Sequence, residues 1–156
     1  MAVASRQFAT KVTPRYGQLN LALYEMKLLP KSEISDSLKS NMDYLVSANE
    51  HKNDCGPTKN WFSDASEDHL LVIVIEEEAP IGIIYYGGKN TAKDVGWWIA
   101  SQYRRRNFGS QAIDLLAGFL KAQGVTGIGQ ITIDTYQGMY NEASSKLVIR
   151  LKEYFI

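Results

Sequence analysis

The sequence is poor in cysteine and histidine. Its single cysteine, Cys55, cannot form an intramolecular disulfide, and one thiol cannot build a metal cluster held by several thiolates. The only two histidines, His51 and His69, lie far apart in the sequence, which argues against a structural or catalytic zinc. We therefore expect no metal in this protein.

Excess charge and long apolar runs are also absent. Seventeen Lys and Arg residues balance 17 Asp and Glu residues, so the chain lacks the broad positive field that nonspecific nucleic-acid binding requires. The longest apolar run, residues 70–75, falls far short of the roughly 20 residues that span a bilayer, and no basic-then-apolar leader opens the chain. We expect a cytoplasmic protein without nucleic-acid or membrane partners, whose anion sites are local.

The length and composition of the chain predict one globular domain. Its 156 residues are 45% apolar and show no repeat or interdomain linker, so a single domain with a hydrophobic core is expected. Residues 1–16 are weakly patterned and read as a flexible arm. Residues 49–66 are polar and predict a loop around the aromatic pair Trp61 and Phe62.

Hydrophobic periodicity predicts a sheet whose strands are separated by helices. The apolar runs and turn signals predict five strands, at 19–29, 70–77, 81–86, 94–100 and 131–134, with a tight turn at 87–90. Near-helical spacing predicts three helices, at 32–48, 109–123 and 141–152, the first capped by Ser32 or Ser35 and the second ended by Gly124. The order predicts an α+β or α/β fold with a mixed sheet and helices on both faces.

Residues 94–110 carry the clearest chemical signal. A strand with an internal glycine, Gly96, is followed by a short turn and by the first turn of the best helix. The first N–H groups of a helix have no internal partner and lie at its positive end, so they bind phosphate well. Gly109 allows close approach, Asn107 tolerates tight-turn dihedrals, and three consecutive arginines add charge. Spacing alone leaves a solvated surface turn equally open.

Three stretches resemble one family. Residues 104–109 resemble the Arg/Gln-x-x-Gly-x-Gly/Ala signature of the GNAT acetyltransferases, with Asn107 in place of the first glycine. Residues 94–99 are similar to the strand before that signature in the ribosomal-protein N-terminal acetyltransferase branch. Residues 141–144 resemble the Asn-x-x-Ser start of that branch's last helix. The marks occur in the family's order over residues 70–152.

The resemblance implies a mostly antiparallel sheet with splayed middle strands that holds acetyl-coenzyme A. It implies that the pantetheine arm meets the opened backbone and that the pyrophosphate rests on the following turn, while Asn141 holds the far side of the arm. The implied cofactor-binding residues are Trp98, Ile99, Ala100, Arg104, Arg105, Arg106, Asn107, Phe108, Gly109, Ser110 and Asn141. The implied reaction is direct acetyl transfer to a primary amine, of a protein N-terminus or a small molecule, without a covalent enzyme intermediate.

Two catalytic residues follow from the resemblance. Ser144 is suited to stabilise or protonate the departing thiolate, since Val148 stands where many relatives have a tyrosine. Asp94 is the candidate base, with Asp134 in reserve, although a solvated strand-end aspartate is equally open. The aromatic residues that line an acceptor pocket or belong to the core are Trp61, Trp97, Tyr85 and Tyr86.

The pattern departs from the family at its end. Relatives continue into further strands, whereas this sequence stops at Ile156, which leaves a sheet edge that proteins normally pair or cover. We therefore expect a homodimer. The alternative functions are a catalytically silent acyl-coenzyme A-binding module and, third, a nucleotide-binding regulatory domain, for which the P-loop spacing is absent.

Overall fold

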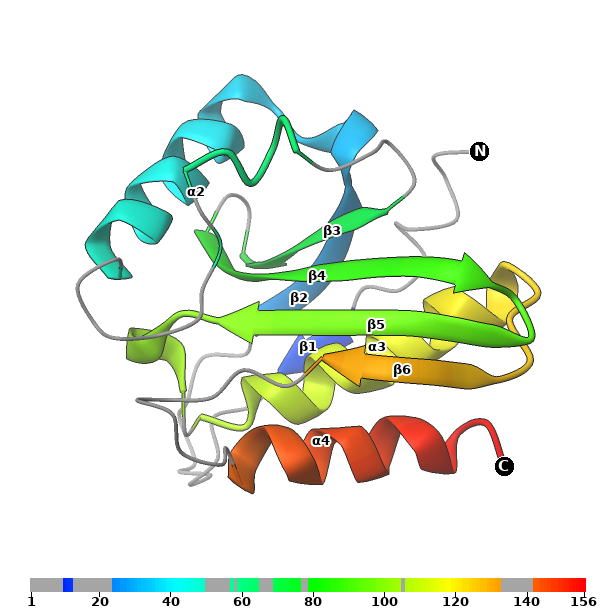
Figure 1. Ribbon diagram of the computed structural model, residues 1–156. Coiled ribbons are helices and arrows are strands. Elements are labelled where there is room, and N and C mark those ends of the chain that lie inside the picture. Colours follow the sequence, from blue (N-terminus) through cyan, green and yellow to red (C-terminus); the bar gives the residue numbers. More distant parts are fainter. Residues whose placement is uncertain are drawn as a thin grey trace.

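The computed structural model describes residues 10–12, 24–49, 57, 59–64, 69–76, 79–104, 106–132 and 142–156. Its centre is one six-stranded sheet in the order β1-β2-β3-β4-β5-β6 (Figure 1). All neighbouring strands are antiparallel except β5 and β6, which are parallel. The strands are β1 (Thr10–Val12), β2 (Tyr24–Pro30), β3 (Leu70–Ile75), β4 (Ala79–Lys89), β5 (Ala92–Ile99) and β6 (Ile128–Thr132).

Strand β3 forms the most buried part of the sheet. Its six residues, all Leu, Val or Ile, are buried on both faces, because helices cover the sheet from both sides. Branched side chains of this kind fill a pleated surface well. Strand β4 continues the core through Ile81, Ile83 and Ile84, none of which is exposed. The centre of the sheet is therefore fixed by hydrophobic burial alone.

Three α-helices in the described ranges cover the two faces of the sheet. Helix α2 (Asp36–Asn49) follows the short 3-10 turn η1 (Lys31–Glu33), and the Leu38 N–H donates to Ser35 Oγ at 3.1 Å, which confirms Ser35 as a cap. Helix α2 packs with Trp61 on one face, while α3 (Phe108–Ala122) and α4 (Glu142–Glu153) pack on the other. Figure 1 shows α3 and α4 side by side. The mixed, mostly antiparallel α+β sheet with helices on both faces is confirmed.

Some boundaries differ from the expectations. The turn predicted at residues 87–90 is shifted, because β4 runs to Lys89 and the chain reverses at Asn90 and Thr91. Within the segment expected to be an arm, Thr10–Val12 forms β1 and pairs with β2. The last strand begins three residues early, at Ile128, and residues 133 and 134 lie outside the described ranges. Gly124, with a φ of 87°, ends α3 as predicted.

None of the helices in the described ranges is long and apolar enough to cross a membrane. The same ranges hold no group of three or more His, Cys, Asp or Glu side chains placed to bind a metal ion.

Candidate functional site

The candidate site begins at the end of β5, between its neighbours β4 and β6. On one edge β5 pairs with β4 along its whole length, from Lys89–Ala92 to Gly82–Ile99. On the other edge, the described pairs with β6 run as far as Gly96–Thr132, and residues 133–141 lie outside the described ranges. The splay of the two strands that the sequence predicts therefore stays a prediction.

Neighbouring residues at the end of β5 direct their N–H and C=O groups to opposite sides of the strand. Lys93 donates its N–H to Gly127 on the β6 side, whereas Ala100 donates to Ile81 O on the β4 side at 2.9 Å. Because backbone directions alternate along a strand, Ile99 directs its backbone groups to the β6 side, whereas Trp98 and Ala100 direct theirs to β4. The predicted pantetheine-binding roles of the three residues stay predictions.

Arg104 is tied to the end of β5. Its Nε–H donates to the Ile99 carbonyl oxygen at 2.8 Å, which holds the turn against the strand. Its pyrophosphate-binding role stays a prediction. Arg106 is exposed to solvent, and Arg105 lies outside the described residues.

The turn after β5 sets the position at which α3 begins. A 3-10 turn, η2 (Ser101–Tyr103), leads to an extended Arg104 and then to Asn107, which has φ 64° and ψ 12°. This left-handed conformation is the one for which glycine is usual and asparagine is tolerated, so the prediction for Asn107 is confirmed. Phe108 then buries its ring edge-to-face against Tyr103, with ring centroids 6.4 Å apart. These features fix the direction in which α3 begins.

The first turn of α3 leaves backbone amides without acceptors inside the helix. Gln111 is the first residue whose N–H reaches back along the helix, to Asn107 O at 3.5 Å. The amides of Gly109 and Ser110 precede it and have no acceptor within the helix, and they lie at its positive end. A Cβ on Gly109 would lie 2.9 Å from Leu147 Cδ1. Gly109 therefore also permits the close approach of α4 to α3.

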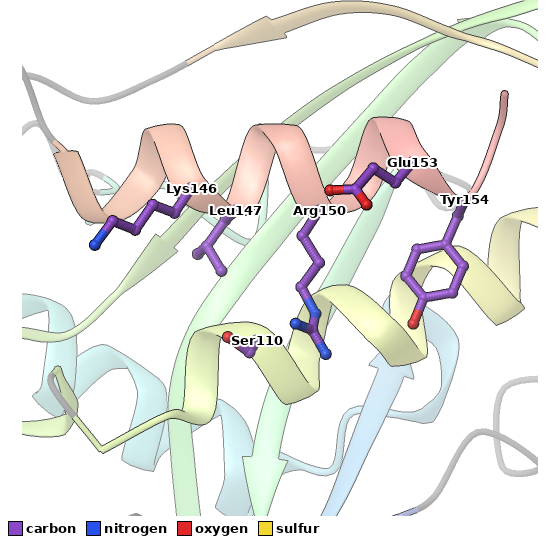
Figure 2. Close-up of a pocket in the computed structure, with 6 residues that line it drawn as sticks. All are labelled: Ser110, Lys146, Leu147, Arg150, Glu153 and Tyr154. Atoms are coloured by element: carbon purple, nitrogen blue, oxygen red, sulfur yellow. The ribbon is translucent and has the colours of Figure 1, made fainter.

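A groove runs between α3 and α4 from this point. It has a volume of about 560 Å³ and is lined by Ser110, Lys146, Leu147, Arg150, Glu153 and Tyr154 (Figure 2). Arg150 binds Asp114 through two hydrogen bonds of 2.7 and 2.8 Å, and Tyr154 OH donates to the same carboxylate at 2.6 Å. Burial raises the pKa of Asp114, but the Arg150 and Tyr154 hydrogen bonds and the Arg150 charge outweigh burial and lower it. The network holds the two helices together.

Only some of the predicted catalytic residues lie within the described ranges. Ser144 is half-buried in the first turn of α4, and Val148 packs against the core one turn later. Asp94 is exposed, and its Oδ1 accepts the Gln130 N–H at 2.8 Å, so it braces β5 against β6. Its catalytic role stays a prediction. Asn141, Asp134 and Cys55 lie outside the described residues.

The four aromatic candidates separate clearly. Trp61, 2% exposed, donates its indole N–H to Asp43 Oδ1 at 2.8 Å, and Trp97 and Tyr86 belong to the core beneath α3. Only Tyr85 is partly exposed, on the α2 side of the sheet and opposite Gly96. Burial, and then the charge of Asp64, raise the pKa of Tyr85 to about 12. Tyr85 is therefore a neutral phenol at physiological pH.

Two polar features near the end of β5 could not be predicted from the sequence. The buried indole Nε1 of Trp98 has no hydrogen-bond partner in the described part of the chain. The buried Asn49, the last residue of α2, contacts Ser101 and Gln102 in the turn after β5. Sequence spacing could not reveal the Asn49 contact, because Gln102 is 53 positions away. It could not reveal the Trp98 indole either, because the burial of one nitrogen depends on packing.

The end of β5, the left-handed Asn107 and the start of α3 follow one another where the sequence predicts a cofactor-binding turn. The profile of the acetyltransferase (GNAT) family matches residues 33–142, more than half of the chain. The chain therefore belongs to this family, whose members are acyl-coenzyme A-dependent acetyltransferases that use acetyl-coenzyme A.

Solved structures show the same fold. Mycobacterium smegmatis RimJ in complex with CoA-disulfide is 13% identical, with a TM-score of 0.57, and the match covers 90% of this chain and 72% of that one. The GNAT domain of S. lividans PAT is 10% identical, with a TM-score of 0.59 and coverages of 95% and 87%. Identities this low support the fold and nothing finer. No curated protein matches the sequence.

Proposed function

We propose that this protein transfers the acetyl group of acetyl-coenzyme A directly to a primary amine, of a protein N-terminus or a small molecule. The observation that carries the proposal is that the end of β5 leads through the left-handed Asn107 into the start of α3, where Gly109 and Ser110 have no acceptor within the helix for their amides. That arrangement offers two backbone features in series, a strand edge and a set of helix amides, which suit an amide-bearing arm followed by a diphosphate.

The proposed cofactor seat uses the described residues as follows. The diphosphate accepts hydrogen bonds from the Gly109 and Ser110 amides, and Arg106 adds positive charge from its exposed position. The pantetheine arm lies along the open edge at Ile99. The nucleotide end extends into the groove between α3 and α4, where Lys146 and Ser110 supply polar contacts (Figure 2). Asn141 and Arg105 remain part of the proposal as predicted from sequence.

The proposed acceptor approaches from the α2 side of the sheet. Because α3 lies on the opposite face, the amine reaches the thioester in this proposal from the α2 side. On that side lie Tyr85, whose pKa is raised in part by the charge of Asp64, and the buried indole N–H of Trp98, which has no hydrogen-bond partner among the described residues. A carboxylate beside a neutral phenol suits a positively charged amine. We assign Asp64 and Tyr85 to acceptor binding.

The proposed chemistry needs two proton transfers. The unprotonated amine nitrogen attacks the thioester carbonyl carbon, the C–S bond breaks, and the nitrogen loses a proton to a base while the thiolate gains one. Ser144, in the first turn of α4, is the proposed donor to the thiolate, and Asp94 is the proposed base. Replacement of Asp94 by Asn preserves an acceptor for the Gln130 N–H, so a fall in kcat of about 100-fold with an intact fold is expected. An unchanged kcat would remove Asp94 from the mechanism.

The alternative function is a catalytically silent acyl-coenzyme A-binding module. Both functions predict binding of acetyl-coenzyme A, and they differ only in turnover. Thiol release from acetyl-coenzyme A should be followed across a panel of peptides with free N-termini, polyamines and aminoglycosides. Release with any amine supports the enzyme, and silence across the panel together with tight binding supports the module.

The cofactor seat has a sharper test than replacement of Gly109, because a side chain there would also press on Leu147. A Ser110→Glu substitution places a negative charge in the first turn of α3, which suits the helix start but repels a diphosphate. The matched control is Ser110→Gln, of similar size and no charge. Calorimetry should show at least about tenfold weaker acetyl-coenzyme A binding for Ser110→Glu than for Ser110→Gln. Equal affinities would contradict the seat, and tighter binding of ATP would favour a regulatory nucleotide domain.

A further inference from the structure

Asn49 joins the end of α2 to the turn that follows β5. It is 4% exposed, although it is polar. Its Oδ1 accepts the Ser101 N–H at 3.1 Å and the Ser101 hydroxyl at 2.8 Å. Its Nδ2 donates to Leu45 O at 2.9 Å and to Gln102 Oε1 at 3.2 Å. The amide therefore uses both donors and both lone pairs of its oxygen, which is the full capacity of an asparagine side chain.

Asn49 binds the chain at the point where it leaves β5 and enters η2. Ala100 is still tied to β4 through its N–H, whereas Ser101 begins η2. A buried N–H without an acceptor costs about 1–3 kcal/mol, so the Ser101 amide requires a partner at this exit point. Asn49 supplies it from a helix on the opposite side of the sheet from α3. The contact thus fixes the first residue of the turn from outside that turn.

The position of Ser101 propagates to the start of α3. Within η2 the Tyr103 N–H bonds Ala100 O at 2.9 Å, and the Arg104 N–H bonds Ser101 O at 3.3 Å. Tyr103 also packs against Phe108, the first residue of α3, and Arg104 is tied to Ile99. A displacement of Ser101 therefore moves the groups that set the direction of α3.

We propose that Asn49 is a positioning residue for the cofactor, one that holds the α3 amides at the diphosphate without touching the ligand. The inference rests on the proposed function, because it takes the start of α3 as the diphosphate seat. It adds that the affinity for coenzyme A depends on helix α2, which lies on the same face of the sheet as the proposed acceptor site. A residue with a merely structural role would affect all ligands and the fold alike.

The test compares coenzyme A with pantetheine, which lacks the diphosphate and the nucleotide. Dissociation constants are measured by calorimetry and, for the weaker ligand, by chemical-shift titration, for the wild type and for Asn49→Leu, Ser101→Ala and Gln102→Ala. Asn49→Leu should weaken coenzyme A binding about tenfold and leave the pantetheine constant within about twofold. Ser101→Ala, which keeps the backbone N–H, should weaken coenzyme A about threefold. Gln102→Ala should weaken it less than Ser101→Ala does, because the Gln102 side chain is exposed and water can take its place at Asn49 Nδ2.

Each outcome decides a different point. A wild type that binds coenzyme A no better than pantetheine overturns the proposed diphosphate seat and, with it, the role of Asn49. A wild type that prefers coenzyme A, with an Asn49→Leu variant that keeps the preference or weakens both ligands equally, overturns the positioning role alone. If Asn49→Leu does not fold, Ser101→Ala decides, and an unchanged coenzyme A affinity in that folded variant contradicts the proposal.

Discussion

The two edges of β5 differ in what their residues contact. The edge toward β4 is paired from end to end, with the side chains of Ile83 and Trp98 buried in the core beside it. The edge toward β6 has described pairs as far as Gly96, and beyond it Ile99 O accepts the Arg104 Nε–H from the following turn. One edge is sheet interior and the other is the candidate site.

The difference shows how one strand serves both stability and binding. The paired edge satisfies its backbone groups within the sheet, so it contributes to the cooperative core. At the other edge the Ile99 carbonyl oxygen is bonded by a side chain, that of Arg104, which a ligand could replace in the proposed function. Substitutions on the paired edge should therefore act on folding, and substitutions around the open edge should act on ligand binding.

The largest effect is expected at Gly82 on the paired edge. A Cβ at this position would lie against the Trp98 carbonyl oxygen, closer than real Cβ atoms approach, and the neighbour is backbone that cannot rotate away. Gly82→Ala should lower the free energy of unfolding by about 3 kcal/mol, as overpacking of a rigid core does. Urea denaturation measures it. Gly87→Ala on the same strand, where a Cβ meets nothing within 4 Å, is the control and should change little.

A smaller effect is expected at Asn107, beyond the open edge. Its φ of 64° is strained for a β-branched residue and comfortable for glycine. Asn107→Val should lower the unfolding free energy by about 1–2 kcal/mol and weaken acetyl-coenzyme A binding, whereas Asn107→Gly should preserve both. Thermal denaturation and calorimetry give the two readings. A valine variant with wild-type affinity would show that the turn does not need this conformation to bind.

The smallest effect is expected at Asp114, in the contact between α3 and α4. The folded pKa of Asp114 is below its unfolded value, so its stabilisation is present above a pH of about 3.9 and fades as the pH falls further. Asp114→Asn should lower the unfolding free energy by under about 1 kcal/mol at pH 7, because the Arg150 pair is partly exposed. Urea denaturation should show this difference shrinking at pH 3. A difference that persists at pH 3 would contradict an electrostatic origin.

Sequence patterns predicted the fold well because hydrophobic burial decides it. The all-apolar residues 70–75 and the amphipathic residues 109–123 allow few alternatives, and both formed the predicted elements within a few positions. The left-handed turn at Asn107 was also predictable, since few residue types adopt it. The turn at Asn90 was misplaced because Gly87 and Gly88 read as turn residues while pairing continues through them.

Finer features of the site were not predictable. Which backbone groups of residues 98–100 face the opening depends on strand register, and a one-residue change reverses them. The return of Arg104 to Ile99 and the contacts of Asn49 depend on three-dimensional packing between distant segments. Tyr85 differs from Tyr86 only in which face of β4 it occupies, yet one borders the site and the other the core.

The most direct test of the account is to follow the backbone amide resonances while coenzyme A is added. The account predicts the largest shifts at Gly109 and Ser110, with further shifts at Ile99, and none at Lys27 on the distant β2 strand. The Ser110→Glu variant should lose these shifts. If Gly109 and Ser110 stayed unmoved while coenzyme A saturated another region, the start of α3 would not be the diphosphate seat, and the proposed function would lose its support.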